Sequence, residues 1–211
     1  MKYKKYWPVL CWGAASLFFT LLIILVDAQP AGVNGTRLGL AGINTAVHKA
    51  VGVSLFWYHV SKTMGVIAIG LALFFAALGL RQWILLKDLK KVHRVFFGLA
   101  VIYGLLAIMW KLFDALAINY RPLLENGKAE PSFPSTHTLL ALVIFGSAVM
   151  VLYQRMEAGR NRTLLMILGI CAAVLTVLAR FLAGVHWLTD IIGGVLFSGL
   201  LLSWFWIFIK E

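Results

Sequence analysis

The chain of 211 residues is 62% hydrophobic and only 13% charged, and its mean hydropathy is +0.91. Soluble domains have roughly 45–50% apolar and about 25% charged residues. This chain therefore has too few polar side chains to cover a globular surface, which excludes a soluble enzyme, a disordered tail and a nucleic-acid-binding domain. Nineteen Lys and Arg against eight Asp and Glu give a net charge of +11, an excess that marks cytoplasmic loops in membrane proteins.

Six apolar stretches are long enough to cross a bilayer core, which takes roughly 20 residues as helix. They cover about residues 7–26, 55–80, 95–117, 137–153, 163–180 and 188–209. The first resembles a secretory signal, but its apolar run exceeds the usual core of about 7–15 residues, so we expect a retained span. The sequence predicts an all-α fold: one domain, residues 1–211, that forms a polytopic membrane bundle of about six transmembrane helices.

A shorter segment between the first two spans predicts an additional helix. Apolar residues recur at three- and four-residue steps through Leu40, Ile43, Val47 and Val51, and Asn44 lies away from that stripe. This pattern is typical of a short amphipathic helix in the membrane interface.

The two cysteines, Cys11 and Cys171, both fall within apolar stretches. Such positions are typical of small buried hydrophobic side chains. They give no disulfide framework and no indication of a redox compartment.

Lys and Arg in short loops predict the orientation of the chain. Twelve of them fall before the first span, in the second and fourth loops or at the C-terminal end, beginning with Lys2. Five fall in the other loops, and Lys62 and Lys111 lie within spans. We expect a multi-pass protein of the cell (inner) membrane with both termini in the cytoplasm, and the odd-numbered loops on the periplasmic or extracellular side.

Three groups of polar residues lie on that outer side by topology. Each ionisable group costs about 2.5–3.5 kcal/mol at the centre of a span and less near its ends, so their presence needs a chemical reason. The groups are Lys111 with Arg121-Pro122, then Pro134-Ser135-Thr136-His137, then Arg180 with His186 and Asp190.

His186 and Asp190 are four residues apart, so on a helix they share one face. A carboxylate there accepts from one imidazole nitrogen and leaves the other as a nucleophile or base. Arg180 adds a charged fork suited to phosphate oxygens. The structural alternative is a histidine with satisfied donors at a helix start and an arginine that extends to the interface.

Ser135 is a predicted N-cap, and the N–H groups that follow it have no partner within the helix. A helix start of this kind binds anions, and His137 in its first turn is placed to donate a proton to a leaving oxygen. An ordinary Pro-Ser helix start explains the same residues without a function.

Together these groups resemble the motifs of the type 2 phosphatidic acid phosphatase family, the membrane relatives of vanadium haloperoxidases. That family has Lys-x6-Arg-Pro, then Pro-Ser-Gly-His, then Ser-Arg-x5-His-x3-Asp. Here Ala179 replaces the leading Ser of the third motif, and Thr136 replaces the Gly of the second. The first motif departs most, because nine residues rather than six separate Lys111 from Arg121.

The resemblance implies a metal-free phosphohydrolase that acts on a lipid phosphate or diphosphate at the outer membrane face. His186 would form a phosphohistidine, Asp190 would orient it, and His137 would protonate the leaving oxygen. The phosphate would be held by Arg121, Arg180, Lys111, Ser135 and Thr136. No cofactor and no nucleic acid is implied, and the expected partners are the lipid substrate and membrane lipids. Candidate substrates are undecaprenyl diphosphate, phosphatidylglycerol phosphate, phosphatidate or diacylglycerol diphosphate, and lipid A phosphates.

Three alternatives stay open. The same site serves a lipid phosphotransferase, two His and one carboxylate also form the non-haem iron triad, and charges within spans also occur in anion transporters. For Lys111 we expect a helix that loosens near Asn119, so that the ammonium reaches the phosphate; the alternative is an ion pair with Asp114.

Overall fold

The computed structural model describes residues 4–125 and 127–210, and within them every regular element is a helix. In chain order the elements are η1 (Lys4–Tyr6), α1 (Trp7–Leu25), η2 (Val33–Gly35), α2 (Ala41–Val51), α3 (Leu55–Leu86), η3 (Leu89–Lys91), α4 (Arg94–Leu116), α5 (Thr136–Arg155), α6 (Arg160–Leu182) and α7 (Leu188–Lys210). The predicted all-α fold is confirmed.

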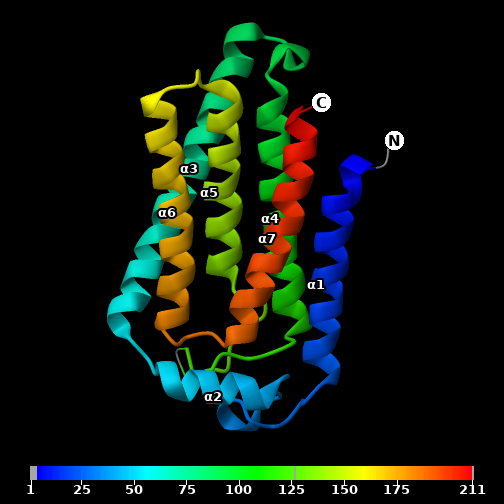
Figure 1. Cartoon of the computed structure of the whole chain (residues 1–211), viewed down its shortest axis with the longest axis vertical. Helices are drawn as coiled ribbons and strands as arrows, with labels where there is room; N and C mark the ends of the chain where they lie inside the picture. The colour runs from blue at the N-terminus through cyan, green and yellow to red at the C-terminus, as the bar shows by residue number, and fades with distance from the viewer. Residues whose placement is uncertain (1–3, 126, 211) are drawn as a thin grey trace.

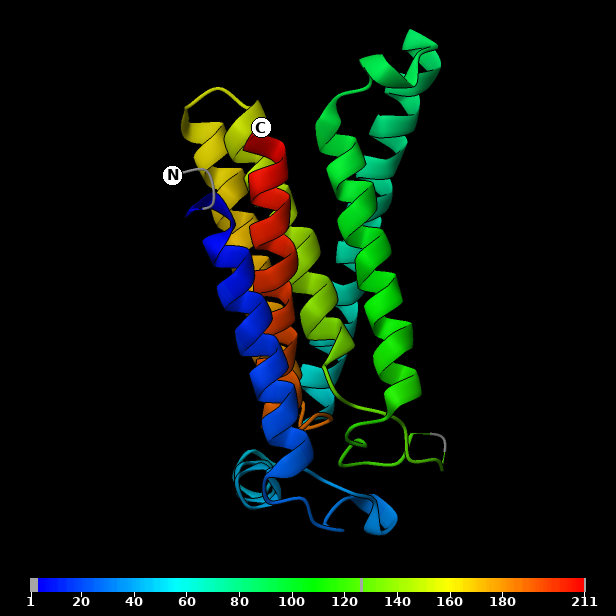
Figure 2. The same ribbon diagram turned by 90° about the vertical axis from the view of Figure 1, so that its right-hand side faces the viewer.

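Six of these helices are long and apolar enough to cross a membrane, and they match the six predicted spans. The largest difference is at α3, which continues to Leu86 although the predicted span ends at residue 80. Arg81 and Gln82 fall in this extension, where long polar side chains reach the interface while their stems stay in apolar surroundings. Figures 1 and 2 together show these helices running along the long axis of the bundle, with α2 across one end.

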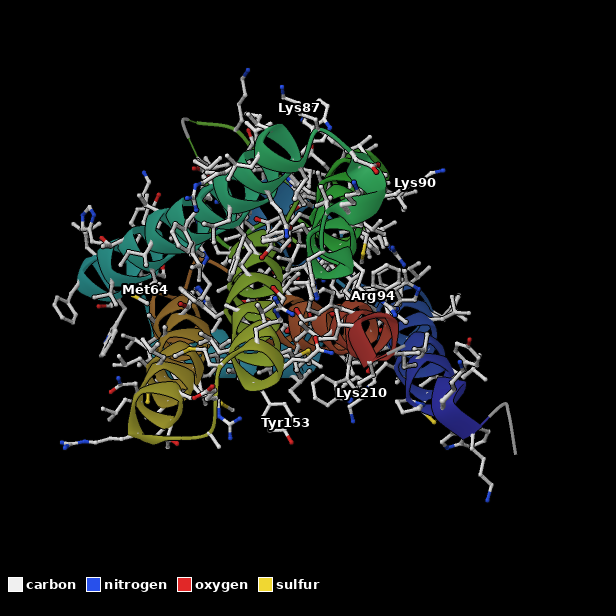
Figure 3. The ribbon with its side chains drawn as sticks, turned by 90° about the horizontal axis from the view of Figure 1, so that it is seen from above. Met64, Lys87, Lys90, Arg94, Tyr153 and Lys210 are labelled. Atoms are coloured by element: carbon white, nitrogen blue, oxygen red, sulfur yellow. The ribbon has the colours of Figure 1, made fainter. Side chains whose placement is uncertain are left out.

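The two ends of the bundle differ in charge. Both chain ends lie at the same end as the α3–α4 and α5–α6 connections, whereas α2 lies at the other end with the α4–α5 and α6–α7 loops (Figure 1). Seen from above, Lys87, Lys90, Arg94 and Lys210 all lie around the first end (Figure 3). Lys2, which counted toward the orientation, falls outside the described residues. The assignment of this basic end to the cytoplasm stays a prediction.

Helix α5 forms the centre of the bundle. It packs against α3, α4, α6 and α7. Of the residues in its most apolar 18-residue stretch, 44% are buried, against 11% in the span that contains α1. Leu139 and Val143 of α5 share a core cluster with Phe205 of α7. Because neighbours surround α5, its first turn is held in the protein interior rather than against lipid.

Helix α2 is tied to the bundle through its polar side. Asn44 is fully buried, donates to the hydroxyl of Thr189 at 2.9 Å and accepts the N–H of the same residue at 3.2 Å. Nε2 of His48 lies 2.9 Å from the carbonyl oxygen of Gly184. Ile43, from the predicted apolar stripe, is 52% exposed. The predicted helix is present, and hydrogen bonds from Asn44 and His48 join it to the rest of the protein.

The expected burial of the two cysteines is wrong. Cys11 on α1 and Cys171 on α6 are both exposed. A membrane bundle presents apolar side chains on its outer face as well as in its core, so an apolar neighbourhood in the sequence does not indicate burial here.

Candidate active site

Residues of the second and third motifs meet at the α2 end of the bundle, where the α6–α7 loop runs beside the first turn of α5. Nδ1 of His186 lies 3.3 Å from Oδ2 of Asp190, and Nε2 lies 3.2 Å from Nη2 of Arg180. All three side chains are buried. The N–H of Ser135 donates to the carbonyl oxygen of Asp190 at 2.9 Å, which joins the start of α5 to the start of α7.

The shared helix face predicted for His186 and Asp190 is wrong, because α7 begins after His186. The contact arises in the turn that opens α7, where Oδ2 of Asp190 also accepts the N–H of Trp187 at 3.0 Å. Gly184 allows the chain to enter this turn: its φ is +65°, and a Cβ atom there would collide with the carbonyl oxygen of Gly52. One carboxylate therefore satisfies a free N–H at a helix start and orients the imidazole.

The surroundings of His186 favour its neutral form. Burial lowers the pKa of His186 well below 6.5, and the charges of Arg180 and Arg121 lower the pKa further. We assign the ring proton to Nδ1, because the Asp190 carboxylate accepts there. Nε2 then carries a lone pair, which is the electronic state that a nucleophile needs.

The first turn of α5 lies as the sequence predicts, but its side chains bond differently. Ser135 occupies the N-cap position without a capping side-chain bond, and its Oγ accepts from the hydroxyl of Thr138 at 3.0 Å. Nδ1 of His137 is buried and has no hydrogen-bond partner. Gly65 of α3 leaves room for the His137 ring, since a Cβ there would lie 3.2 Å from its Cδ2 atom.

A small cavity of about 170 Å³ joins the first motif to the third. Arg121, Thr136 and His186 all line it, together with residues of α4 and the α4–α5 loop. Arg121 is paired with Glu125, while its Nε atom is buried without a partner. The cavity thus places a guanidinium and the His186 ring around one space that suits a phosphate group.

In this structure Lys111 neither lies at the cavity nor forms an ion pair with Asp114. Helix α4 ends before Asn119, as the loosening requires, yet Lys111 is exposed and does not line the cavity. Its Nζ atom lies 4.6 Å from the ring centroid of Trp110, and no ion pair joins it to Asp114 among the described residues. Asp114 lines the cavity instead. It stands seven residues before Arg121, the place that Lys-x6-Arg-Pro gives to lysine.

Helix α3 supplies a wall of the site that the motifs do not include. Nη1 of Arg180 donates to the hydroxyl of Ser61 at 3.3 Å, and its Cζ atom lies 5.7 Å from the ring centroid of Tyr58. Nζ of Lys62 lies 5.6 Å from the same ring, and its charge acts on His137. The available signal was the position of Lys62 within a span, since an ionisable residue there is a functional candidate.

Asn119 and Ser132, also missed from the sequence, surround the second oxygen of Asp190. Nδ2 of Asn119, Oγ of Ser132 and Oδ1 of Asp190 are all buried without a partner at hydrogen-bond geometry. Both donors are near enough to act on the carboxylate of Asp190. The N–H of Gly39 donates to Oδ1 of Asn119 at 2.9 Å. No spacing in the sequence indicates this network, because its members are far apart along the chain.

The iron-triad alternative requires two histidines and a carboxylate around one point. Over residues 4–125 and 127–210, no group of three or more His, Cys, Asp or Glu side chains is arranged to hold a metal ion. The imidazole of His186 is instead engaged by Asp190 on one side and by Arg180 on the other.

The segment that carries these residues matches a known protein family. The family model described as the PAP2 superfamily matches residues 110–211. Residues 110–211 belong to the PAP2 superfamily. This PAP2 segment contains every candidate site residue of the three motifs, from Lys111 to Asp190, and it confirms the resemblance drawn from them.

A solved structure extends the fold comparison to nearly the whole chain. The crystal structure of a transmembrane PAP2 type phosphatidylglycerolphosphate phosphatase from Bacillus subtilis matches with a TM-score of 0.63 and 19% sequence identity. The match covers 97% of this chain and 94% of that chain, so the helices before the PAP2 segment share the arrangement too. No curated protein matches the sequence.

Proposed function

We propose that this protein is an integral-membrane phosphohydrolase that removes phosphate from a lipid phosphate or diphosphate at the outer face of the membrane. The observation that carries the proposal is the position of His186, held between Asp190 and Arg180 and opening on a cavity that Arg121 also lines. A neutral imidazole among fixed cations suits phosphoryl transfer, which depends mostly on positioning and charge stabilisation.

The substrate phosphate binds between Arg121 and Arg180. Arg180 turns its fork from Nε2 of His186 to the phosphate oxygens, and the unpaired Nε of Arg121 adds a donor. The N–H groups of the first turn of α5, from Thr136 to His137, contribute the positive end of the helix dipole. These contacts place phosphorus in front of the imidazole.

Nε2 of His186 then attacks the terminal phosphorus. The bond from that phosphorus to the leaving oxygen breaks, which is the lipid oxygen of a monoester or the bridging oxygen of a diphosphate. Asp190 keeps the proton on Nδ1 and stabilises the positive charge that develops on the ring. His137 gives its proton to the departing oxygen. Water next attacks the phosphohistidine, His137 takes its proton, and inorganic phosphate leaves.

The position of the site and the name of the structural neighbour narrow the choice of substrate. A site at the end of the spans meets lipid phosphates at the headgroup level, and the name of the structural neighbour makes phosphatidylglycerol phosphate the first lipid to assay. The same phosphohistidine also supports transfer to an acceptor lipid, so each assay includes an arm with an acceptor.

The testing experiment measures inorganic phosphate released from a panel of lipid phosphates by purified protein in detergent, with a chelator present. Release that requires His186 and survives chelation supports the proposal. Phosphate that appears only on an acceptor lipid would make the protein a transferase. No release from any lipid, or a strict requirement for added metal, would overturn the proposal.

A further inference from the structure

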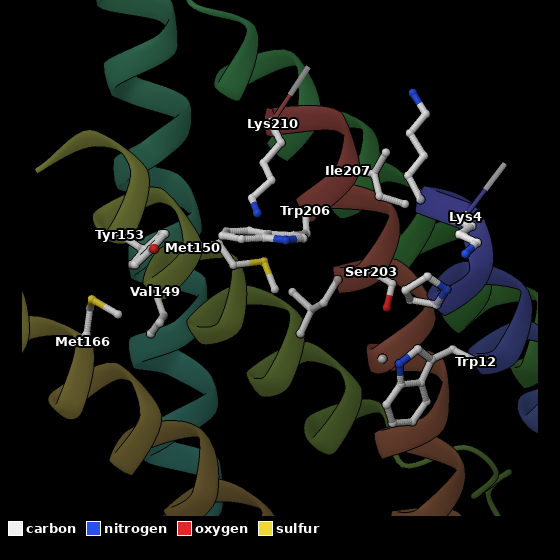
Figure 4. Close-up of a pocket in the computed structure, with 14 residues that line it drawn as sticks. Lys4, Trp12, Val149, Met150, Tyr153, Met166, Ser203, Trp206, Ile207 and Lys210 are labelled. Carbon is white, nitrogen blue, oxygen red and sulfur yellow. The ribbon is translucent and has the colours of Figure 1, made fainter. Parts of the chain in front are cut away.

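A large groove lies at the end of the bundle opposite the proposed active site. It has a volume of about 830 Å³ between α1, α5 and α7, and its lining includes Lys4, Trp12, Tyr153, Ser203, Trp206 and Lys210 (Figure 4). The catalytic candidates lie at the first turns of α5 and α7, whereas this groove follows their last turns. The two sites are therefore separated by the length of the spans.

The groove has a basic mouth. Lys4, Lys5 and Lys210 line it, and Nζ of Lys210 lies 4.3 Å from the ring centroid of Trp206. None of the described residues that line the groove is acidic. Glu211 follows in the sequence, outside the described residues, and the three lysines outnumber it.

The body of the groove is apolar. Val149 and Met150 of α5 face Trp12 of α1 across it (Figure 4). The ring of Trp12 packs directly against Gly199, where an added Cβ would lie 2.5 Å from the ring carbons. The groove therefore offers apolar walls to a hydrocarbon chain and cations at its mouth.

We propose that this groove binds an anionic phospholipid. Its phosphodiester lies between Lys4 and Lys210, and an acyl chain follows the apolar wall toward Trp12. Basic pockets between transmembrane helices on the cytoplasmic side recognise anionic headgroups, and Trp and Tyr occupy the same depth. Helix α1 packs mainly on α7, so a lipid in this position also links α1 to α5.

The test compares two double variants of equal charge. The groove variant, Lys4→Gln with Lys210→Gln, removes two of the three lysine charges that line the groove. The control variant, Lys87→Gln with Lys90→Gln, removes two charges from the α3–α4 side of the same end (Figure 3). Each purified protein is titrated with dioleoylphosphatidylserine and with dioleoylphosphatidylcholine, and bound lipid is counted by native mass spectrometry. Phosphatidylserine is a phosphodiester, which keeps it from acting as a substrate of the proposed monoester or diphosphate hydrolysis.

Wild type is expected to retain phosphatidylserine in preference to phosphatidylcholine. Each lysine contributes about a fivefold gain in affinity at a lipid surface, so the groove variant loses at least fivefold while the control variant keeps its affinity. Equal losses in both variants, or equal retention of the two lipids by wild type, would overturn the proposal.

A third variant separates the groove from general surface charge. Ser203→Phe fills the middle of the groove and leaves all lysines in place, so it should also lower retention of phosphatidylserine. Unchanged retention would show that the lysines act without the groove and would contradict the proposal. Phosphate release, measured on every variant, reports that the protein is folded and depends on the opposite end of the bundle.

Discussion

His186 and Asp190 meet across the start of α7 rather than along it: Nδ1 of the imidazole lies 3.3 Å from Oδ2 of the carboxylate, and the same oxygen accepts the N–H of Trp187. A carboxylate fixed by a backbone donor holds the ring in one tautomer with little freedom to rotate. The turn of the chain before α7 thus prepares the proposed nucleophile.

The first prediction concerns this pair. His186→Ala removes the covalent route, so phosphate release should fall by roughly 10³-fold or more. Asp190→Ala should also cause a large loss, and the double variant should be little worse than His186→Ala alone, because the two residues act in one step. Steady-state phosphate release by purified, monodisperse protein gives the comparison. Near-wild-type turnover of folded His186→Ala would remove His186 as the nucleophile.

The second prediction is a pH dependence of stability. The pKa of His186 is lowered in the folded protein, so below about pH 6.5 the unfolded chain binds a proton that the folded protein does not. Stability is therefore fully present above pH 6.5 and declines as the pH falls toward the folded pKa. Thermal unfolding in detergent at pH 7.5 and pH 5.5 measures this loss.

The matched variants for that measurement are His186→Gln and His59→Gln, since His59 is exposed on α3. His186→Gln should reduce the difference in melting temperature between the two pH values, whereas His59→Gln should leave it unchanged. An identical pH difference in wild type and His186→Gln would contradict the prediction.

The third prediction separates the two lysines that lie within spans. Both lysines are exposed and neither lines the cavity, but the ammonium of Lys62 lies over the Tyr58 ring that Arg180 also faces. Lys62→Met should lower kcat/KM for phosphate release by about tenfold, which is about 1.4 kcal/mol of transition-state stabilisation. Lys111→Met should stay within about twofold of wild type. The reverse order would restore Lys111 to the phosphate site.

The fourth prediction concerns the side of the membrane. Cysteines introduced at Lys90 and Lys128, in a background with Cys11→Ala and Cys171→Ala, should react with an impermeant thiol reagent from opposite sides. Lys90 should be reached from the cytoplasm, because its end of the bundle carries the basic residues. Labelling of both positions from one side would break the proposed topology.

The spans and three of the candidate site residues follow from the sequence alone. Length and hydropathy identify helices that cross a membrane because hydrocarbon forces every backbone group into internal hydrogen bonds. The cost of ionisable groups at span ends selects Arg180, His186 and Asp190 without structural knowledge, and the structure brings these residues together.

Other features depend on contacts between distant segments, which no local pattern encodes. Helical periodicity relates a residue to its own helix and not to the neighbour that the helix faces. For this reason the sequence does not indicate that Asn119 lies beside Asp190, or which of the two lysines within spans lies near Arg180. The tertiary structure decides where these side chains lie, because each loop is held by partners far away along the chain. An example is Asn119, whose side-chain oxygen accepts the N–H of Gly39.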